Sequence, residues 1–225
     1  MCTAYYNVLE RLKEERCRLH LSQSEMGQLV PMSQSNYSKI ELGQRRLSYY
    51  EMQYLCRTDV DIHYIFTGQR YNGKQEELLE NSTYAELISY LRILYSLAVP
   101  RKQQQPKAQW DVVFDKVQYV PLIVENYSSG SLFSLLRRSM NYQQQKMAKT
   151  MGIDVKKLRD LENGRSLPDS ELLYRMYDLF HVSPSIVLKD RDSLICEISI
   201  LLDTINTESR KEIIKFLTTL RKVNE

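Results

Sequence analysis

The chain has 225 residues, 43% of them hydrophobic and 26% charged, with seven glycines, six prolines and a formal net charge of +3. This is the composition of an ordinary globular protein, and the scarcity of glycine and proline favours helices over a turn-rich β fold. The mild positive charge permits a polyanionic partner without demanding one. Because the sequence contains no apolar run of membrane-spanning length and no signal-peptide pattern at its start, we expect a cytoplasmic protein that binds no membrane.

The residue types that usually carry catalysis or bind metals are scattered. Four cysteines and three histidines have no paired or ligand-like spacing, which indicates reduced thiols and no metal site. The sequence also lacks a glycine-rich phosphate loop, a His-Glu-x-x-His motif and a Gly-x-Ser-x-Gly motif. We therefore expect no enzymatic activity, no catalytic residues and no cofactor.

The sequence repeats itself. "SQSNYSKIELGQRR" begins at Ser33, and "DVKKLRDLENGRS" begins at Asp154, with the two Glu-x-Gly triplets at Glu41 and Glu162. At the same separation, Arg16 aligns with Arg137, Gln23 with Gln144, Met26 with Met147, and Gly43 with Gly164. Farther along, "ELISYLRIL" pairs with "EIIKFLTTL" at a slightly larger separation. A duplicated unit of about a hundred residues explains these matches.

Each unit shows the pattern of an all-α bundle of short helices. Serines at positions 22 and 33 are good N-caps, and the glycine at position 43 is an expected helix stop. The predicted helices of the first unit span about 4–18, 23–29, 34–42, 48–57 and 61–66. Those of the second span about 132–140, 144–151, 155–163, 169–180 and 183–188.

The units divide the chain into three parts. Residues 1–98 form a first domain with its core at 5–68, and residues 128–225 form a second with its core at 132–190. Between them, residues 99–127 form a linker and an apolar segment of ambiguous structure, since two prolines flank a charged, glutamine-rich stretch. An amphipathic helix follows each bundle, at 84–98 and 210–222. These helices either form a homodimer interface or cover the core of their own bundle.

The phrases "RLKEERCRLHLSQSEMGQLV" and "SQSNYSKIELGQRR" in the first unit, and "LLRRSMNYQQQKMAKTMGIDVKKLRDLENGRSLP" in the second, resemble the Cro and phage-repressor type of helix-turn-helix domain, the XRE family. The resemblance covers a little over half of the chain. It implies two five-helix, lambda-repressor-like bundles in tandem. It also implies a sequence-specific regulator of transcription that binds double-stranded DNA with the third helix of one or both bundles in the major groove. Membership of the family suggests a repressor and leaves activation open.

Transferred position by position, the family pattern places Gln23 and Gln144 at the start of the helix that crosses the DNA backbone, where helix N-termini face phosphates. Glutamine and asparagine suit adenine, and lysine and arginine suit guanine or phosphate. The remaining predicted DNA contacts are Gln34, Ser35, Asn36, Ser38, Lys39, Arg45 and Arg46 in the first unit, and Lys156, Lys157, Arg159 and Arg165 in the second.

The resemblance also implies structural ion pairs, Arg16 with Glu41 and Arg137 with Glu162, that tie the first helix of each unit to the third. Breaking a buried pair from one side typically costs about 3–5 kcal/mol. We therefore expect Glu41→Ala to unfold the first unit without affecting any side chain that contacts DNA.

Three positions depart from the family pattern. Pro31 replaces the glycine of the helix-turn-helix turn that Gly152 supplies in the second unit, so the first turn must be built differently. Leu42 stands where the second unit has Asn163, and Gln143 replaces a good serine cap. Two alternatives stay open: both units bind DNA as an intrachain pseudo-dimer, or the second unit holds phosphate or a partner. The rival function is a degenerate helix-turn-helix module that binds protein, such as an antitoxin-like or regulatory partner.

Overall fold

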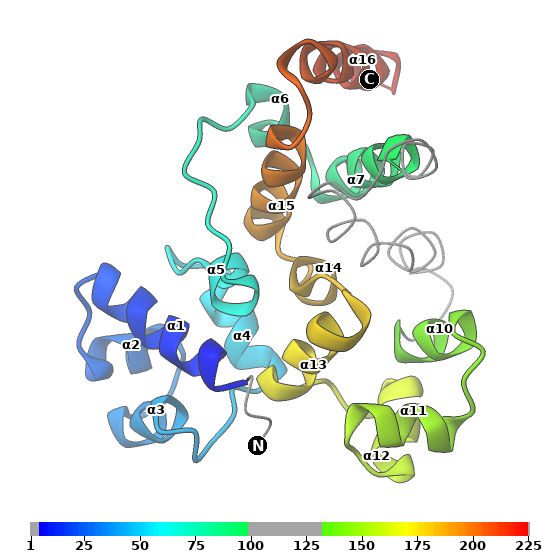
Figure 1. Ribbon diagram of the computed structural model, residues 1–225. Helices are drawn as coiled ribbons and strands as arrows, with labels where there is room; N and C mark the ends of the chain where they lie inside the picture. Colours follow the sequence, from blue (N-terminus) through cyan, green and yellow to red (C-terminus); the bar gives the residue numbers. More distant parts are fainter. Residues whose placement is uncertain (1–4, 99–131, 225) are drawn as a thin grey trace.

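The computed structural model describes residues 5–98 and 132–224, and every regular element in these two ranges is a helix. Figure 1 shows the first five helices at one side of the molecule. We call these the first helical unit: α1 (Tyr6–Arg18), α2 (Gln23–Leu29), α3 (Gln34–Glu41), α4 (Tyr49–Leu55) and α5 (Ile62–Thr67). The second helical unit comprises α10 (Leu132–Ser139), α11 (Gln144–Met151), α12 (Val155–Glu162), α13 (Ser170–Phe180) and α14 (Pro184–Leu188).

All ten of these helices were predicted, most with ends within one or two residues of those observed. The remaining helices form what we call the end cluster: α6 (Glu77–Glu80), α7 (Tyr84–Ala98), α15 (Arg191–Asp203) and α16 (Thr207–Asn224). Of these, α6 and α15 were not predicted. The proposed linker at 99–127 lies outside the described residues. No described helix is both long and apolar enough to cross a membrane.

Local sequence explains where the helices begin and end. The side chain of Ser22 accepts a hydrogen bond from the backbone N–H of Glu25, and the Glu25 carboxylate accepts one from the N–H of Ser22, which is a complete capping box. Ser33 caps α3 by accepting from the N–H of Asn36. Gly43 follows α3 with φ 73°, a left-handed conformation that glycine adopts without strain. Tyr37 and Ile40 face inward and are fully buried, as the helical spacing predicts.

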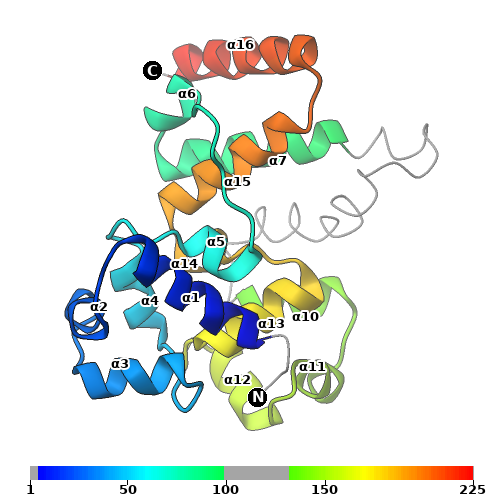
Figure 2. The ribbon, with the colours of Figure 1, turned by 60° about the vertical axis from the view of Figure 1, so that its left-hand side comes forward.

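The two helical units share one apolar core. In both Figure 1 and Figure 2, α13 lies between the first unit and helices α10, α11 and α12 of the second. The phenol ring of Tyr5 on the first unit lies 6.3 Å from the ring of Tyr174 on α13, measured between centroids. Farther along the interface, the Tyr49 hydroxyl donates to the carbonyl of Val187 at 3.2 Å. The units therefore pack directly on one another.

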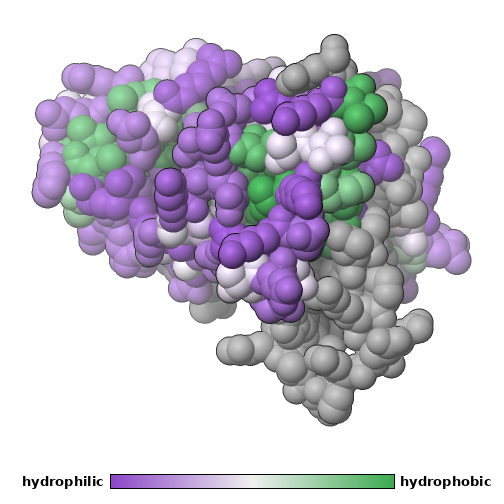
Figure 3. Space-filling model, turned by 90° about the horizontal axis from the view of Figure 1, so that it is seen from above, coloured by the Kyte–Doolittle hydropathy of each residue, from purple (hydrophilic) through white to green (hydrophobic). Residues whose placement is uncertain are grey.

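The end cluster has a separate apolar core to which both amphipathic helices contribute. Leu87 and Leu91 of α7, Ile198 and Leu202 of α15, and Leu217 of α16 are all buried there. The alternative in which each amphipathic helix covers the core of its own bundle therefore does not hold, because both helices contribute to one shared cluster. Figure 3 looks onto this end of the molecule and shows apolar side chains among a mostly polar surface.

These apolar faces are consequently buried within a single chain. The same faces were the ones expected to pair in a homodimer. Phe216 and Val223 of α16 remain exposed at 54% and 78%. Homodimerisation through α7 and α16 stays a prediction, and it would have to use side chains other than the buried leucines.

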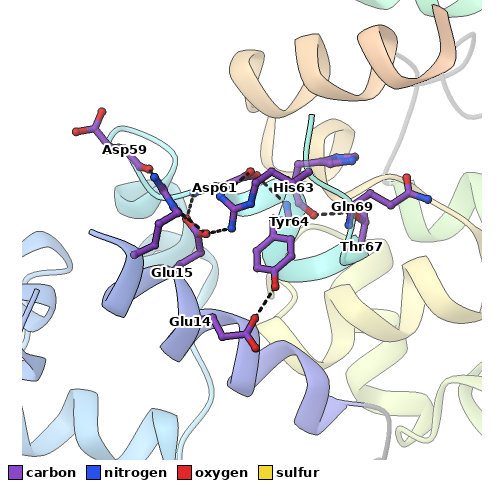
Figure 4. Close-up of polar contacts among 10 residues, drawn as sticks. Glu14, Glu15, Asp59, Asp61, His63, Tyr64, Thr67 and Gln69 are labelled. Carbon is purple, nitrogen blue, oxygen red and sulfur yellow. Dashed lines mark hydrogen bonds and ion pairs between the residues drawn. The ribbon is translucent and has the colours of Figure 1, made fainter. Parts of the chain in front are cut away.

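A buried carboxylate ties α1 to the segment around α5. Glu15 is fully buried and accepts hydrogen bonds from Arg18, from Arg70 and from the backbone N–H of Asp61 (Figure 4). Arg70 also lies over the ring of Tyr64, 4.2 Å from its centroid. Burial opposes ionisation, but the arginine and backbone hydrogen bonds outweigh it and hold the pKa of Glu15 below its ordinary value.

His63 lies on α5, the helix that contacts both α13–α14 and α15. Its side chain is buried, and neither ring nitrogen has a hydrogen-bond partner among the described residues. Burial lowers the pKa of His63, and the nearby carboxylates of Glu197 and Asp61 offset only part of this effect. The imidazole is therefore neutral in the folded protein at neutral pH.

This burial predicts an acid-sensitive stability. In the unfolded chain, His63 takes up a proton near its ordinary pKa of about 6.5, whereas the folded protein resists protonation. The unfolded state then binds more protons, so the free energy of unfolding should fall as pH drops below that value, by at most about 1.4 kcal/mol per pH unit. Urea denaturation at pH 7.0, 6.0 and 5.5 measures this slope.

The matched variants are His63→Phe and His20→Asn. The first removes the buried imidazole and should flatten the slope. The second replaces an exposed histidine that has φ 56°, a conformation asparagine tolerates, and should leave most of the slope in place. An unchanged slope in His63→Phe would contradict the assignment.

Candidate nucleic-acid interface

The third helix of the second unit, α12, presents basic side chains to solvent. Lys156 and Arg159 of α12 are exposed, as is Arg165 in the loop that follows the helix. Lys157 is partly buried, and its ammonium donates to the hydroxyl of Ser166 at 2.7 Å. Asp154 caps the helix by accepting from the N–H of Lys157. The predicted DNA contacts on this helix and the loop after it are all lysines and arginines. They offer positive charge and hydrogen-bond donors but no acceptors.

The third helix of the first unit, α3, presents small polar and amide side chains. Gln34, Ser35, Asn36 and Lys39 are exposed, and Ser38 is partly buried. Four of the five predicted contacts on this helix therefore lie fully on the surface. The two faces differ in chemistry, since α3 offers both donors and acceptors whereas α12 offers mainly cations.

Behind each of these helices lies the same buried ion pair. In the first unit, Arg16 Nε donates to Glu41 Oε1 at 2.7 Å, and the Glu41 side chain is 6% exposed. In the second, Arg137 Nε donates to Glu162 Oε1, with that carboxylate 7% exposed. Each arginine also donates to the backbone carbonyl five residues later. Arg16 donates to Leu21 at 2.9 Å, and Arg137 donates to Tyr142 at 3.1 Å. The ion pairs implied by the resemblance are thus present in both units.

The carboxylate of each pair also holds the glutamine that begins the second helix. Gln23 Nε2 donates to Glu41 Oε2 at 2.7 Å, and Gln144 Nε2 donates to Glu162 Oε2 at 2.7 Å. Both glutamines occupy the first position of their helix, α2 or α11, as predicted.

The glutamines in turn contact the third helix. The amide of Gln34 donates to Gln23 Oε1 at 3.1 Å, and Arg159 Nε donates to Gln144 Oε1 at 3.2 Å. A hydrogen-bonded chain therefore runs from the buried carboxylate to the exposed face. The expectation that Glu41→Ala would affect no predicted DNA contact is therefore wrong, because Glu41 accepts a hydrogen bond from Gln23, which in turn accepts one from Gln34.

The turn between the second and third helices differs between the two units, as their sequences require. In the second unit, Gly152 ends α11 in a left-handed conformation with φ 63°. In the first, Pro31 cannot adopt that conformation, and α2 ends one position earlier relative to α11, with Val30 extended at φ −114°. Leu42 is 64% exposed at the end of α3. Gln143 provides no side-chain cap for α11.

The arginines that follow α3 have partners within the chain. Arg45 Nη2 donates to Glu51 Oε1 at 2.5 Å, and Arg46 forms an ion pair with Glu171 of the second unit. Neither pairing was predicted. Arg46 and Glu171 are 125 positions apart in the chain, and no periodicity in the sequence joins them. Both arginines remain predicted phosphate contacts. To bind a phosphate, each guanidinium would have to contact it together with its present carboxylate partner or leave that partner.

The two third helices lie toward the same end of the molecule. Figure 1 and Figure 2 both place α3 and α12 at the lower end, opposite α16. Among the described residues, no group of histidine, cysteine, aspartate and glutamate is arranged to hold a metal ion. The arrangement offers two exposed polar helices on one side of a packed scaffold, which suits contact with an extended polar partner.

The buried pair predicts a large loss of stability on substitution. Glu41→Ala strands the Arg16 guanidinium and the Gln23 amide, and we expect a loss of about 3 kcal/mol or more in the free energy of unfolding. Urea denaturation followed by circular dichroism measures it. Glu10→Ala, which removes an exposed carboxylate from α1, is the control and should change stability little. If Glu41→Ala and Glu10→Ala were equally stable, the structural role assigned to Glu41 would be wrong.

Comparison with known proteins identifies a domain type for the second unit. Residues 134–187, which run from α10 to α14, match the model of a helix-turn-helix family. No curated protein and no solved structure is significantly similar to the chain. The match covers less than half of the chain and does not extend to the first unit. It identifies an XRE-type helix-turn-helix domain in the second unit, which indicates a DNA-binding regulator.

Proposed function

We propose that this protein is a sequence-specific regulator of transcription that binds double-stranded DNA through both helical units. The first unit is a second, diverged copy of the helix-turn-helix domain, and α3 and α12 are the two recognition helices. Each enters a major groove, while α2 and α11 cross the DNA backbone. The regulator acts as a repressor by occupying its site.

The observation that carries this proposal is the repeated Arg–Glu–Gln arrangement. The same three residue types, at the same spacing, make the same hydrogen bonds in both units. In each unit the carboxylate is buried and the glutamine begins the second helix. Two unrelated helical bundles have no reason to share an arginine donor, a glutamate acceptor and a glutamine donor on corresponding helices. This supports assigning to the first unit the domain type identified in the second.

The face of α3 supports base recognition with a preference for adenine. Gln34 and Asn36 are exposed amides, and an amide can both donate to and accept from the major-groove edge of adenine. Lys39 can reach guanine or a phosphate. The contact from Gln34 to Gln23 restricts the Gln34 side chain before DNA arrives, which reduces the entropy lost on binding.

The face of α12 supports a different preference. Lys156 and Arg159 are exposed cations that suit the two acceptors of guanine or the phosphate backbone. Because Arg159 already donates to Gln144, its guanidinium is held near the start of α11, where a phosphate would approach. The two units should therefore recognise unlike half-sites.

Selection from a random-sequence DNA pool at physiological salt tests the function. We expect the wild-type protein to enrich a two-part motif. Gln34→Ala should relax one part and Lys156→Ala the other, each by about 1–3 kcal/mol at the affected base pair. Lys215→Ala on α16, at the opposite end of the molecule, is the control and should leave the motif unchanged. A motif that responds to Gln34→Ala alone would restrict sequence reading to the first unit.

The alternative function is a helix-turn-helix scaffold that binds protein. Two observations favour it: the rebuilt turn at Val30 and the exposed Leu42, which offers an apolar side chain where the second unit has a polar one. Salt dependence distinguishes the two functions. A DNA-binding protein should lose affinity with a log–log slope of roughly −0.9 for each phosphate contacted. A shallow slope without an enriched motif would favour the protein-binding module.

A further inference from the structure

We propose that Glu171, on α13, is a positioning residue that locks α3 and α12 at one relative placement, so that the chain recognises two DNA half-sites at a single spacing. The inference rests on the proposed function, since it assumes that both units contact DNA. It concerns a different property, the distance between half-sites rather than the sequence of either.

The Glu171 carboxylate links the two units directly. Its side chain is 4% exposed. One oxygen, Oε2, accepts from Arg46 Nε, which lies in the loop that follows α3. The other, Oε1, accepts from Arg175 Nη2 at 2.7 Å. One buried carboxylate is therefore held between a guanidinium of the first unit and a guanidinium of the second.

Arg175 carries the link onward to the turn of the second unit. Its Nη1 donates to the carbonyl of Met151 at 2.7 Å and to that of Gly152 at 3.3 Å. These carbonyls lie at the end of α11, immediately before α12. A β-carbon at Gly152 would lie 2.2 Å from Arg175 Nη1, so any other residue at this position would displace the guanidinium. The contacts form a continuous path from the loop that follows α3 to the turn that joins α11 to α12.

The residue next to Glu171 anchors the same interface independently. The Ser170 hydroxyl lies 2.5 Å from the Tyr5 hydroxyl and accepts from the backbone N–H of Leu47 at 3.1 Å. The Ser170 N–H donates to the Leu47 carbonyl at 2.9 Å. These contacts, with the shared apolar core, hold the units together without the carboxylate. Removing the charge of Glu171 should therefore loosen the orientation of the units without separating them.

The physical effect of losing the charge follows from the two arginines. Arg46 and Arg175 have side chains that are 44% and 23% exposed, so both can turn toward solvent. Without the carboxylate between them, their like charges repel, and the path from α3 to α12 is broken at its centre. The two units can then rotate slightly about their apolar contact.

A fixed placement has a direct consequence on DNA. Half-sites on one face of B-DNA are about 34–36 Å apart for each turn of 10–10.5 base pairs. Adding or removing one base pair shifts one half-site along the helix and rotates it by about a tenth of a turn. Two recognition helices held at a fixed distance and angle cannot stay in contact with a half-site that has both shifted and rotated. A locked pair should therefore discriminate sharply between spacers.

The test measures affinity for a series of duplexes that carry the selected two-part site with its spacer lengthened or shortened by one or two base pairs. We expect wild-type protein to bind one spacer at least about tenfold more tightly than its neighbours, equivalent to losing one good base contact. Glu171→Gln, which keeps the size of the side chain, should flatten this profile while affinity for each isolated half-site stays unchanged. Asp178→Asn, on the exposed side of α13, is the control and should keep the wild-type profile.

The outcomes separate the two proposals. A Glu171→Gln profile as sharp as that of the wild type overturns the positioning role and leaves the proposed function standing. Failure of the wild-type protein to enrich a two-part motif instead overturns the proposal of two DNA-contacting units. If Glu171→Gln does not fold, Arg46→Gln breaks the link from the other side and leaves the contact between Glu171 and Arg175. Because Arg46 is also a predicted phosphate contact, this variant should lower the affinity for every duplex by the same factor while it flattens the spacer profile.

Discussion

A buried carboxylate that holds an arginine and a glutamine is the interaction on which each helical unit depends. Glu41 and Glu162 are taken out of water, which is costly unless their charge and lone pairs are satisfied. The arginine of the first helix neutralises the charge, and the glutamine of the second fills the remaining oxygen. Because the partners come from three helices, the hydrogen bonds fix the angles between those helices. The same glutamine reaches the exposed face, so the scaffold and the proposed DNA contacts share one network.

The second constraint is that both units belong to one chain and pack on each other. Their shared core and the contacts of α13 place α3 and α12 toward one end, while α7 and α16 meet in the end cluster at the other (Figure 1). The apolar faces of α7 and α16 are therefore buried against each other and against α15 within one chain. Because the exposed faces of α3 and α12 carry different side chains, the proposed function gives the chain two different recognition surfaces on one scaffold.

Much of this organisation could be predicted from the sequence because its determinants are local. Ser22, Ser33 and Gly43 mark helix ends by backbone chemistry that acts over a few residues. The repeat placed the corresponding helices of the second unit, where Asp154 caps α12 and Gly164 follows it with φ 70°, although Gln143 gives α11 no side-chain cap. Pro31 predicted an altered turn for the same reason, since proline forbids the left-handed conformation that Gly152 adopts.

The parts that could not be predicted depend on contacts between distant segments. Helix α15 has buried side chains on several sides, because it packs against both α5 and α7, and so it lacks the single apolar stripe that identifies a surface helix. The ion pair of Arg46 with Glu171 joins residues of different units, and either residue alone resembles an ordinary surface charge. The burial of His63 likewise depends on the packing of α5 and has no local signal.

The central claim is that one chain brings two DNA-contacting units to one duplex. Hydroxyl-radical footprinting of the complex with selected DNA, combined with the mass of that complex, tests this claim most directly. The account predicts one chain for each duplex and two protected segments on the same face of the DNA, separated by a fixed interval. A single protected segment, or two chains bound to one symmetric site, would contradict it.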